Sequence, residues 1–253
     1  MTAGVQLVRS ADRFATDWGW LDSRHSFSFG QHYDANNTGF GVLLVSNEDV
    51  VAPGAGFETH PHRDMEIVTW VIEGSLVHQD SHGHSGVIYP GLAQRMSAGT
   101  GILHSEKNDE WVLNATAVHD KPVHFIQMWV IPDTASLTPS YDQLDISAEL
   151  EAGGLVPVVS GMPGHDSAIR IAQKEATLLA ARIPDGGQVS VPDAAFAHVF
   201  VTQGSVELEG SGVLAQGDAA RITRAQGQRI TALAGPAEVL IWQMNSRRRH
   251  CYA

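Results

Sequence analysis

The sequence has little of several features that mark particular classes of protein. It has a single cysteine, Cys251, which excludes an intrachain disulfide. Its apolar runs are far shorter than the roughly 20 residues that a membrane-spanning helix needs. Residues 1–9 lack the basic-then-apolar pattern of a secretory signal. These absences predict a cytoplasmic protein that does not enter a membrane.

Positive charge is also scarce. Lys and Arg total 16 against 28 Asp and Glu, which gives a formal net charge of −12. A surface of that sign repels a phosphate backbone, and no stripe of Lys or Arg opposes the repulsion. The only basic cluster, at 247–249, is interpreted as a solvated tail. Direct binding of nucleic acid is therefore not expected.

Glycine, proline and short apolar runs are abundant. The 25 glycines and 11 prolines recur between runs rich in Val, Ile, Leu and Phe. Such punctuation is typical of many short β-strands. Hydrophobic residues make up 43% of the chain and charged residues 17%, as in chains that form a core. We therefore predict an all-β globular protein.

Two pairs of side chains with strand spacing point to a metal site. His60 and His62 are two residues apart, and so are His104 and Glu106. Side chains at i and i+2 leave the same face of a strand. Antiparallel strands lie about 4.8 Å apart, so two facing pairs can converge on one ion. Imidazole and carboxylate ligands suit divalent Fe, Ni, Cu, Mn, Co or Zn.

The surroundings of these pairs resemble a known superfamily. Residues 54–74 are similar to the first motif of the cupins and residues 93–108 to the second. There are small departures: Gly74 comes one residue late, and Ala93 and Gly99 replace the usual glycine and proline. The resemblance implies a small β-barrel around the metal.

Within the cupins, the chain is similar to the pirins. Residues 59–66 and 96–106 resemble that family, and residues 19–30 and 125–130 resemble its bacterial, quercetinase-type members. The resemblance implies a metal-dependent dioxygenase, with Fe(II) as the expected metal, that cleaves a flavonol-like aromatic substrate with dioxygen. Some pirins look like regulators, so the alternative is a metal- and redox-responsive protein that acts through a protein partner.

The resemblance also implies a ligand set of three histidines and one glutamate: His60, His62, His104 and Glu106. Glu66 then becomes a partner that supports a ligand. From the residues alone, both glutamates share strand parity with their histidines, and either could accept a proton from the substrate. Asn108 keeps the same parity and either orients a ligand or closes a turn.

The second half of the chain repeats the first. Residues 200–206 overlay 70–76, and residues 217–222 overlay 91–96. This repeat predicts a bicupin, with two double-stranded β-helix barrels in tandem. The overlay puts five residues at or near the positions of the ligands and Glu66: Ser190, Pro192, Phe196, Ile230 and Ala232. Apolar side chains cannot hold a cation, so the second barrel is expected to be metal-free.

A change of composition suggests the domain boundary. Residues 132–167 are rich in Pro, Gly, Ser and acidic side chains, as in a linker. We expect a metal-binding cupin domain at 1–133, followed at 134–253 by the linker and a degenerate cupin domain.

An extended segment near the N-terminus is a candidate pocket wall. His25, Phe27 and Phe29 alternate with small residues and would share one face of a strand. They form either part of the substrate pocket or an aromatic face that caps the barrel. Four tryptophans are expected in the core rather than the site: Trp18, Trp20, Trp70 and Trp129. His82 and His84 lie in a Gly/Ser-rich turn and are expected to be solvated.

Overall fold

Most of the chain forms β-strands, as the spacing of glycine and proline predicts. The computed structural model describes residues 4–108 and 120–247, which contain 22 strands and two short helices, α1 (Ser147–Glu151) and η1 (Ser10–Asp12). Neither helix of these described ranges is long and apolar enough to cross a membrane. Cys251 and two arginines of the basic cluster, Arg248 and Arg249, lie outside the described residues.

The first barrel consists of a seven-stranded and a four-stranded sheet. In hydrogen-bonded order, the large sheet is β12 (Ser140–Asp145), β9 (Leu92–Ser97), β6 (Glu66–Glu73), β11 (Val123–Val130), β4 (Leu43–Val51), β3 (Leu21–His25) and β2 (Phe14–Asp17). The small sheet is β5 (Gly56–His62), β10 (Ile102–Lys107), β7 (Leu76–Asp80) and β8 (Ser85–Ile88).

The second barrel has the same plan. Its large sheet is β1 (Gly4–Val8), β20 (Ala219–Ala225), β17 (Ala194–Gln203), β22 (Ala237–Met244), β15 (Ala176–Ile183), β13 (Val156–Ser160) and β14 (Ile169–Arg170). Its small sheet is β16 (Gln188–Ser190), β21 (Arg229–Ala232), β18 (Ser205–Leu208) and β19 (Gly212–Ala215). The two orders correspond except at the outer edge of the large sheets, where β2 pairs antiparallel with β3 but β14 pairs parallel with β13. This correspondence confirms the predicted tandem barrels.

Two glycines show the correspondence at the level of single residues. Gly74 follows β6 and Gly204 follows β17, with φ of 79° and 74° respectively. A Cβ at Gly74 would lie 2.9 Å from the carbonyl oxygen of Pro122, and one at Gly204 would lie 2.5 Å from that of Pro236. The same left-handed turn is therefore packed against the same neighbouring segment in both barrels, where only glycine fits without strain.

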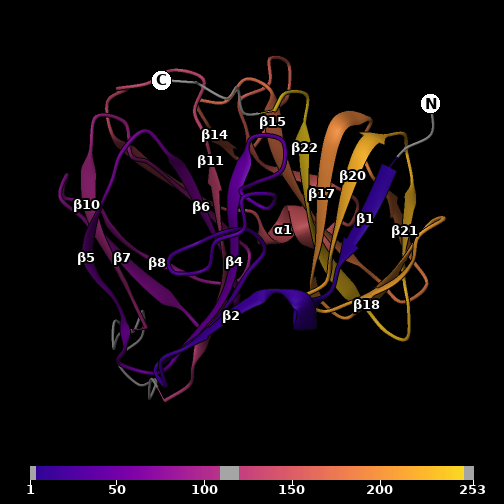
Figure 1. Cartoon of the computed structure of the whole chain (residues 1–253), viewed down its shortest axis with the longest axis horizontal. Coiled ribbons are helices and arrows are strands. Elements are labelled where there is room, and N and C mark those ends of the chain that lie inside the picture. The colour runs from indigo at the N-terminus through magenta and orange to yellow at the C-terminus, as the bar shows by residue number, and fades with distance from the viewer. Residues whose placement is uncertain (1–3, 109–119, 248–253) are drawn as a thin grey trace.

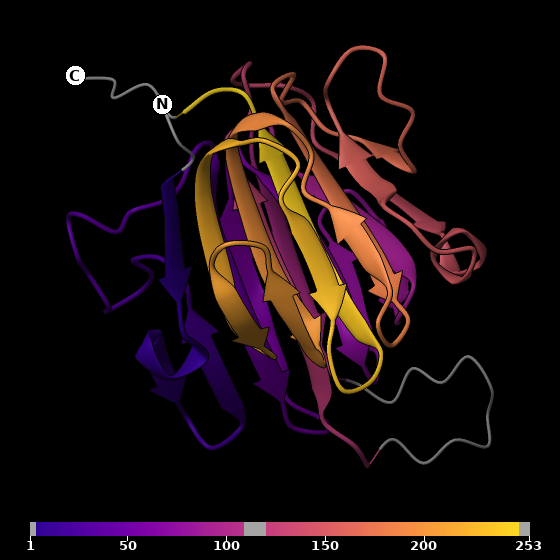
Figure 2. The same cartoon turned by 90° about the vertical axis from the view of Figure 1, so that its right-hand side faces the viewer.

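Each barrel donates its leading strand to the other. β1 precedes the first barrel in the chain but pairs antiparallel with β20 of the second, over Gly4–Val8 and Ala219–Thr223. Figure 1 shows β1 in indigo beside the orange and yellow strands, and Figure 2 shows it at the edge of their sheet. Conversely, β12 precedes the second barrel and pairs with β9 of the first. The predicted boundary at 133/134 is thus crossed twice by strand pairing.

The stretch predicted as a linker, 132–167, is built into the fold. It contributes β12 to the first barrel, β13 to the second, and α1 between them. Leu150 of α1 and Val158 of β13 are buried in the core shared by the two barrels. Composition suggested a linker because polar residues dominate the exposed face of β12, whereas the pairing of its backbone with β9 does not show in composition.

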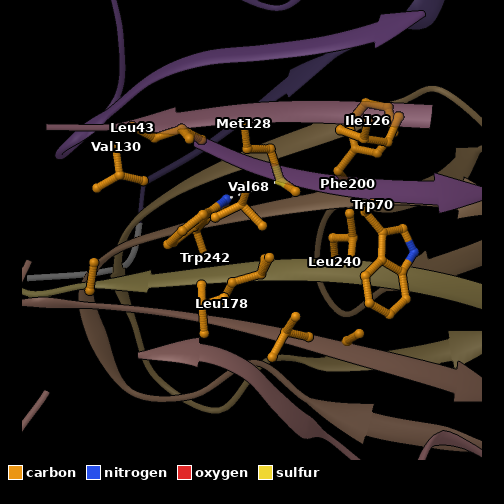
Figure 3. Close-up of a cluster of buried hydrophobic side chains, with 14 of the residues drawn as sticks. Leu43, Val68, Trp70, Ile126, Met128, Val130, Leu178, Phe200, Leu240 and Trp242 are labelled. Atoms are coloured by element: carbon orange, nitrogen blue, oxygen red, sulfur yellow. Dashed lines mark hydrogen bonds between the residues drawn. The ribbon is translucent and has the colours of Figure 1, made fainter. Parts of the chain in front are cut away.

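The two large sheets pack against each other and form the main core (Figure 3). Met128 and Trp70 come from the first sheet, and Trp242 and Phe200 from the second. The Trp242 Nε1–H group lies 3.2 Å from the sulfur of Met128, and Trp70 Nε1 donates to Glu238 Oε1 at 2.9 Å. β6 is buried along nearly its whole length because one face meets this core and the other faces the barrel interior.

Candidate metal centre and its pocket

Three histidines converge inside the first barrel from two adjacent strands. β5 and β10 are antiparallel neighbours, with His104 opposite His60 and Ile102 opposite His62. The ring centroids of His60 and His104 are 4.4 Å apart, and those of His62 and His104 are 4.9 Å apart. One ring nitrogen of each histidine lies within 4.8 Å of those of the other two. The expected convergence of the two strand pairs is thus present for the imidazoles.

The hydrogen bonds of these rings leave one nitrogen of each available. His60 Nδ1 is 2.7 Å from the carbonyl oxygen of Glu58, which can only accept, so Nδ1 carries the proton and Nε2 is bare. His62 Nε2 and His104 Nε2 are buried without a hydrogen-bond partner in the part of the chain that the structure describes. Buried polar atoms normally have a partner, and a cation is the partner that three bare nitrogens suit.

Burial also keeps two of the rings neutral. It lowers the pKa of His62 to about 4, with the neighbouring His104 and His60 contributing. It lowers the pKa of His104 to about 3, with His60 and His78 contributing. Neutral imidazoles have free lone pairs at neutral pH, as metal ligands must. The residues present therefore fit a divalent transition metal.

Glu106 lies at the back of this centre and is held by two neighbours. Gln127 Nε2 donates to its Oε2 at 2.6 Å, and Thr69 Oγ1 donates to its Oε1 at 3.4 Å. Gln127 is itself oriented by Trp129, whose Nε1 donates to Gln127 Oε1 at 2.9 Å. A β-bulge between His104 and Glu106 breaks their shared register against β5. Ligand atoms of Glu106 lie within 4.8 Å of those of His104 and His78.

His78 is a site residue that sequence reasoning missed. It lies on β7, directly opposite Glu106, and is fully buried. A signal was present: His78 and Asp80 are two apart on a strand that begins with the apolar Leu76, so both point to the face that Leu76 buries.

The two histidines of the following turn were expected to be solvated. His82 is exposed, as expected, but His84 is half-buried and contacts Asp80 through Nδ1 at 2.9 Å.

Glu66 lies outside the site, contrary to expectation. It is buried on β6 and accepts a hydrogen bond from Ser97 Oγ at 2.8 Å. On β6 it shares parity with Val68 and Trp70, which face the core between the barrels. Strand parity does not carry over from His62 because the chain turns at Asp64, where φ is 47°. Glu66 is therefore not among the residues that line the pocket, where it was predicted to act.

A pocket of about 430 Å³ is lined by two of the three histidines, His60 and His62, and by Glu106. Aromatic side chains form much of its wall: Trp18, Trp20, Phe29, Phe57 and Trp129. Four tryptophans were expected in the core. Trp70 is buried there, whereas Trp20 and Trp129 are half-buried, pack against smaller core clusters and also line the pocket. Trp129 packs edge-on against His62 at 4.7 Å between ring centroids, and Trp18 is 56% exposed at the mouth. The expectation was wrong because the barrel interior is open here rather than filled.

The predicted wall of His25, Phe27 and Phe29 is only partly present. His25 and Phe29 line the pocket, with their rings stacked at 5.2 Å. Phe27 instead packs in the core between the barrels, under the guanidinium of Arg221 at 4.5 Å. The reason is that β3 ends at His25. Beyond it the backbone bends, and side chains no longer alternate.

Asp49 is a second carboxylate of the pocket and was not predicted. It lies on β4 and is buried beside Ser23, whose Oγ donates to Asp49 Oδ1. Burial raises the pKa of Asp49 to about 7; the hydrogen bond from Ser23 opposes the rise and the charge of Glu106 adds to it. The available signal was a run of four polar residues, 46–49, flanked by apolar residues within one strand. Asn108 has a structural role: its Nδ2 donates to the carbonyl oxygens of Val51 and Lys121.

Comparisons with known proteins agree with this picture. The family model described as Pirin matches residues 7–130. The Mycobacterium tuberculosis protein named "Putative quercetin 2,3-dioxygenase Rv0181c" is 57% identical over 247 residues, which is 98% of both chains. Escherichia coli "Quercetin 2,3-dioxygenase" is 45% identical over 139 residues, 55% of this chain and 57% of the other.

Solved structures extend the similarity to the whole fold. The crystal structure of YhhW from Escherichia coli has a TM-score of 0.84 at 33% identity and covers 98% of this chain and 100% of its own. The structure described as bacterial pirin YhhW in complex with nickel(II) has a TM-score of 0.82 at 33% identity, over 96% of this chain and 100% of its own.

Proposed function

Because this chain belongs to the pirin family of cupins, we propose that it is a metal-dependent dioxygenase that opens a flavonol-like substrate at the centre of its first barrel. One observation carries the proposal. Ring nitrogens of three histidines lie within 4.8 Å of one another, and two of these residues, His60 and His62, line a pocket of about 430 Å³ whose wall is aromatic. A flat phenolic molecule can stack on such a wall. The names of the relatives, which specify quercetin, support the same class of substrate.

We assign His60, His62 and His104 as metal ligands, with Glu106 as the fourth. Ligand atoms of Glu106 lie within 4.8 Å of those of His104 and His78, but Glu106 does not belong to the set formed by His60, His62 and His104. Coordination by Glu106 together with all three histidines therefore requires a movement of its side chain. We propose Fe(II) as the native metal, and the nickel-bound relative supports a site for first-row metals. When bound, such a metal supplies a Lewis acid and a redox partner for dioxygen.

The chain itself must take the proton from the substrate hydroxyl. Asp49 and Glu106 are the carboxylates among the described pocket residues that are buried. Both oxygens of Glu106 already accept hydrogen bonds from Gln127 and Thr69. Among the described residues, Asp49 accepts a hydrogen bond on Oδ1 alone, from Ser23. Its pKa of about 7 places it near the optimum for a general base at neutral pH. We propose Asp49 as the proton acceptor.

Turnover of a flavonol by the metal-loaded protein tests the proposal. The Fe(II)-loaded protein should bleach the long-wavelength absorbance of quercetin and consume dioxygen, while His60→Ala and His104→Ala should do neither. Asp49→Asn should lower the rate roughly 100-fold or more with unchanged metal content. Asp22→Asn, on the exposed face of β3, is the matched control.

The negative outcome is equally specific. If the folded, metal-loaded protein leaves quercetin and related flavonols unchanged under oxygen, the dioxygenase proposal fails. The alternative is then favoured: a regulatory protein whose binding to a protein partner depends on the redox state of the metal.

A further inference from the structure

We infer that Asp80 and His78 are positioning residues that set the tautomer and orientation of His104, and through it the affinity of the centre for metal. The inference rests on the proposed metal centre but not on the identity of the substrate. It concerns a row of buried side chains on the small sheet of the first barrel, behind the candidate ligands.

The three residues form one chain of contacts. β7 and β5 flank β10 on opposite sides, so His78 and Asp80 lie on the far side of His104 from His60. His104 Nδ1 is 3.4 Å from His78 Nδ1, and His78 Nε2 is 3.3 Å from Asp80 Oδ2. The side chains of His78 and Asp80 are both fully buried. The chain therefore runs through the interior, shielded from competing water.

The proton positions follow from the end of that chain. A carboxylate can only accept hydrogen bonds, so Asp80 requires the proton of His78 on Nε2. A neutral imidazole has one N–H, so His78 Nδ1 is bare and accepts from His104 Nδ1–H. His104 Nε2 is then the bare nitrogen. Nε2 of His104 is buried without a hydrogen-bond partner among residues 4–108 and 120–247, and a ring nitrogen of His104 lies within 4.8 Å of one in each of the other two histidines.

Asp80 is itself anchored by the turn that follows it. The backbone N–H groups of His82 and His84 donate to its Oδ1 at 2.9 and 3.1 Å, and the ring of His84 contacts its Oδ2 at 2.9 Å. Burial alone would raise the pKa of Asp80, but the hydrogen bonds from His78 and from the turn outweigh it and lower the pKa. The turn between β7 and β8 therefore holds a carboxylate charge at a fixed distance from the metal ligands.

The plane of His78 is fixed independently by β12, the strand exchanged between the barrels. The rings of His78 and Tyr141 are stacked, with centroids 4.7 Å apart and planes 25° apart. Partners behind a metal-bound histidine commonly contribute about 10- to 100-fold in metal affinity. A similar contribution is expected here, because the chain selects the tautomer in which His104 can coordinate.

The tautomer of His104 in the metal-free protein is the direct test and needs no variant. Two-bond ¹⁵N–¹H correlations should show the His104 proton on Nδ1 and the His78 proton on Nε2. A proton on His104 Nε2 would overturn the inference. This measurement is independent of catalysis, so failure of the dioxygenase proposal leaves it unaffected.

Metal titration of three variants provides the second test. His78→Leu fills a similar space without an acceptor and should weaken metal binding about 10- to 100-fold, and Asp80→Asn should weaken it in the same direction. His78→Gln offers an acceptor oxygen to His104 Nδ1 and should stay within a few-fold of the wild type. His82→Gln, in the same turn but exposed, is the control and should bind as the wild type does.

The pair of His78 variants also separates positioning from direct coordination. Ligand atoms of His78, His104 and Glu106 lie close enough to hold an ion themselves. If His78 were a ligand, Gln would fail as badly as Leu, and the inference would be wrong. Unchanged affinity in His78→Leu would overturn it as well.

Discussion

At the scale of single residues, two buried glutamates of similar sequence context have opposite surroundings. Glu106 lies in the barrel interior, against Gln127 and Thr69, and within reach of His104. Glu66 lies against Ser97 on the side of β6 that faces the second barrel. Burial raises the pKa of Glu66, although the hydrogen bond from Ser97 and the charge of Arg95 oppose the rise.

Exchange of each glutamate for glutamine should therefore have different effects. Glu106→Gln should lower metal affinity by more than the roughly 100-fold expected for a supporting residue, because it removes a direct ligand. Glu66→Gln should retain the metal, since the amide is nearly isosteric with the carboxyl group and Glu66 contacts Ser97 rather than the ligands. Metal content after dialysis against a graded chelator measures both. Loss of metal in Glu66→Gln alone would show that Glu66 reaches the site.

At the scale of elements, strand periodicity was reliable only within one strand. His60 and His62 share β5, and they converge as their spacing predicts. The same parity fails from His25 to Phe27 and from His62 to Glu66, because a strand ends between the members of each pair. Side chains alternate between faces only while the backbone is extended. The local sequence pattern does not show at which residue the strand ends.

The exchanged strands were beyond sequence reasoning for a different reason. The apolar content of 4–8 is compatible with a strand, but its partner, β20, lies more than 200 residues away. Pairing of that kind depends on the packed positions of the two barrels. The strands within each repeat can be predicted from the sequence. The sheet to which β1 adds cannot, because it depends on how the two barrels pack.

Removal of β1 should test its importance to the second barrel. Leu7 packs against the interior of that barrel and Val8 against the main core. Deletion of residues 1–8 should cost roughly 2–4 kcal/mol from lost apolar burial and expose the edge of β20. Lower thermal stability and concentration-dependent association on size exclusion are expected. A melting temperature equal to that of the full chain would contradict this role, and Val5→Thr, at an exposed position, is the control.

At the scale of the whole molecule, the two barrels share a plan but differ in what fills them. Both groups of metal-binding side chains found in the described residues lie in the first barrel. The interior of the second is packed with aliphatic residues, among them Val206, Leu208, Ile230 and Ala232. Ile230 lies opposite Leu208, as Glu106 lies opposite His78. An apolar side chain therefore occupies the position in the second barrel that Glu106 has in the first.

One metal ion per chain is the expected stoichiometry. Aliphatic side chains cannot replace the hydration shell of a cation, so only the first barrel should bind tightly. Elemental analysis of the purified protein measures the ratio of metal to chain. Two tightly bound ions per chain would contradict it, and His60→Ala with His104→Ala should reduce the ratio toward zero.

The reciprocal placement of β1 and β12 has a consequence for symmetry. Two separate barrels that traded their leading strands would form an isologous dimer, in which each copy completes the other. The chain has this arrangement with both copies on one polypeptide. In a true homodimer, every substitution appears in both subunits. In a fused pair, each barrel has its own sequence and can change alone. One barrel can hold metal and substrate. The other, with its interior filled by aliphatic side chains, supports the first through the exchanged strand and the shared core.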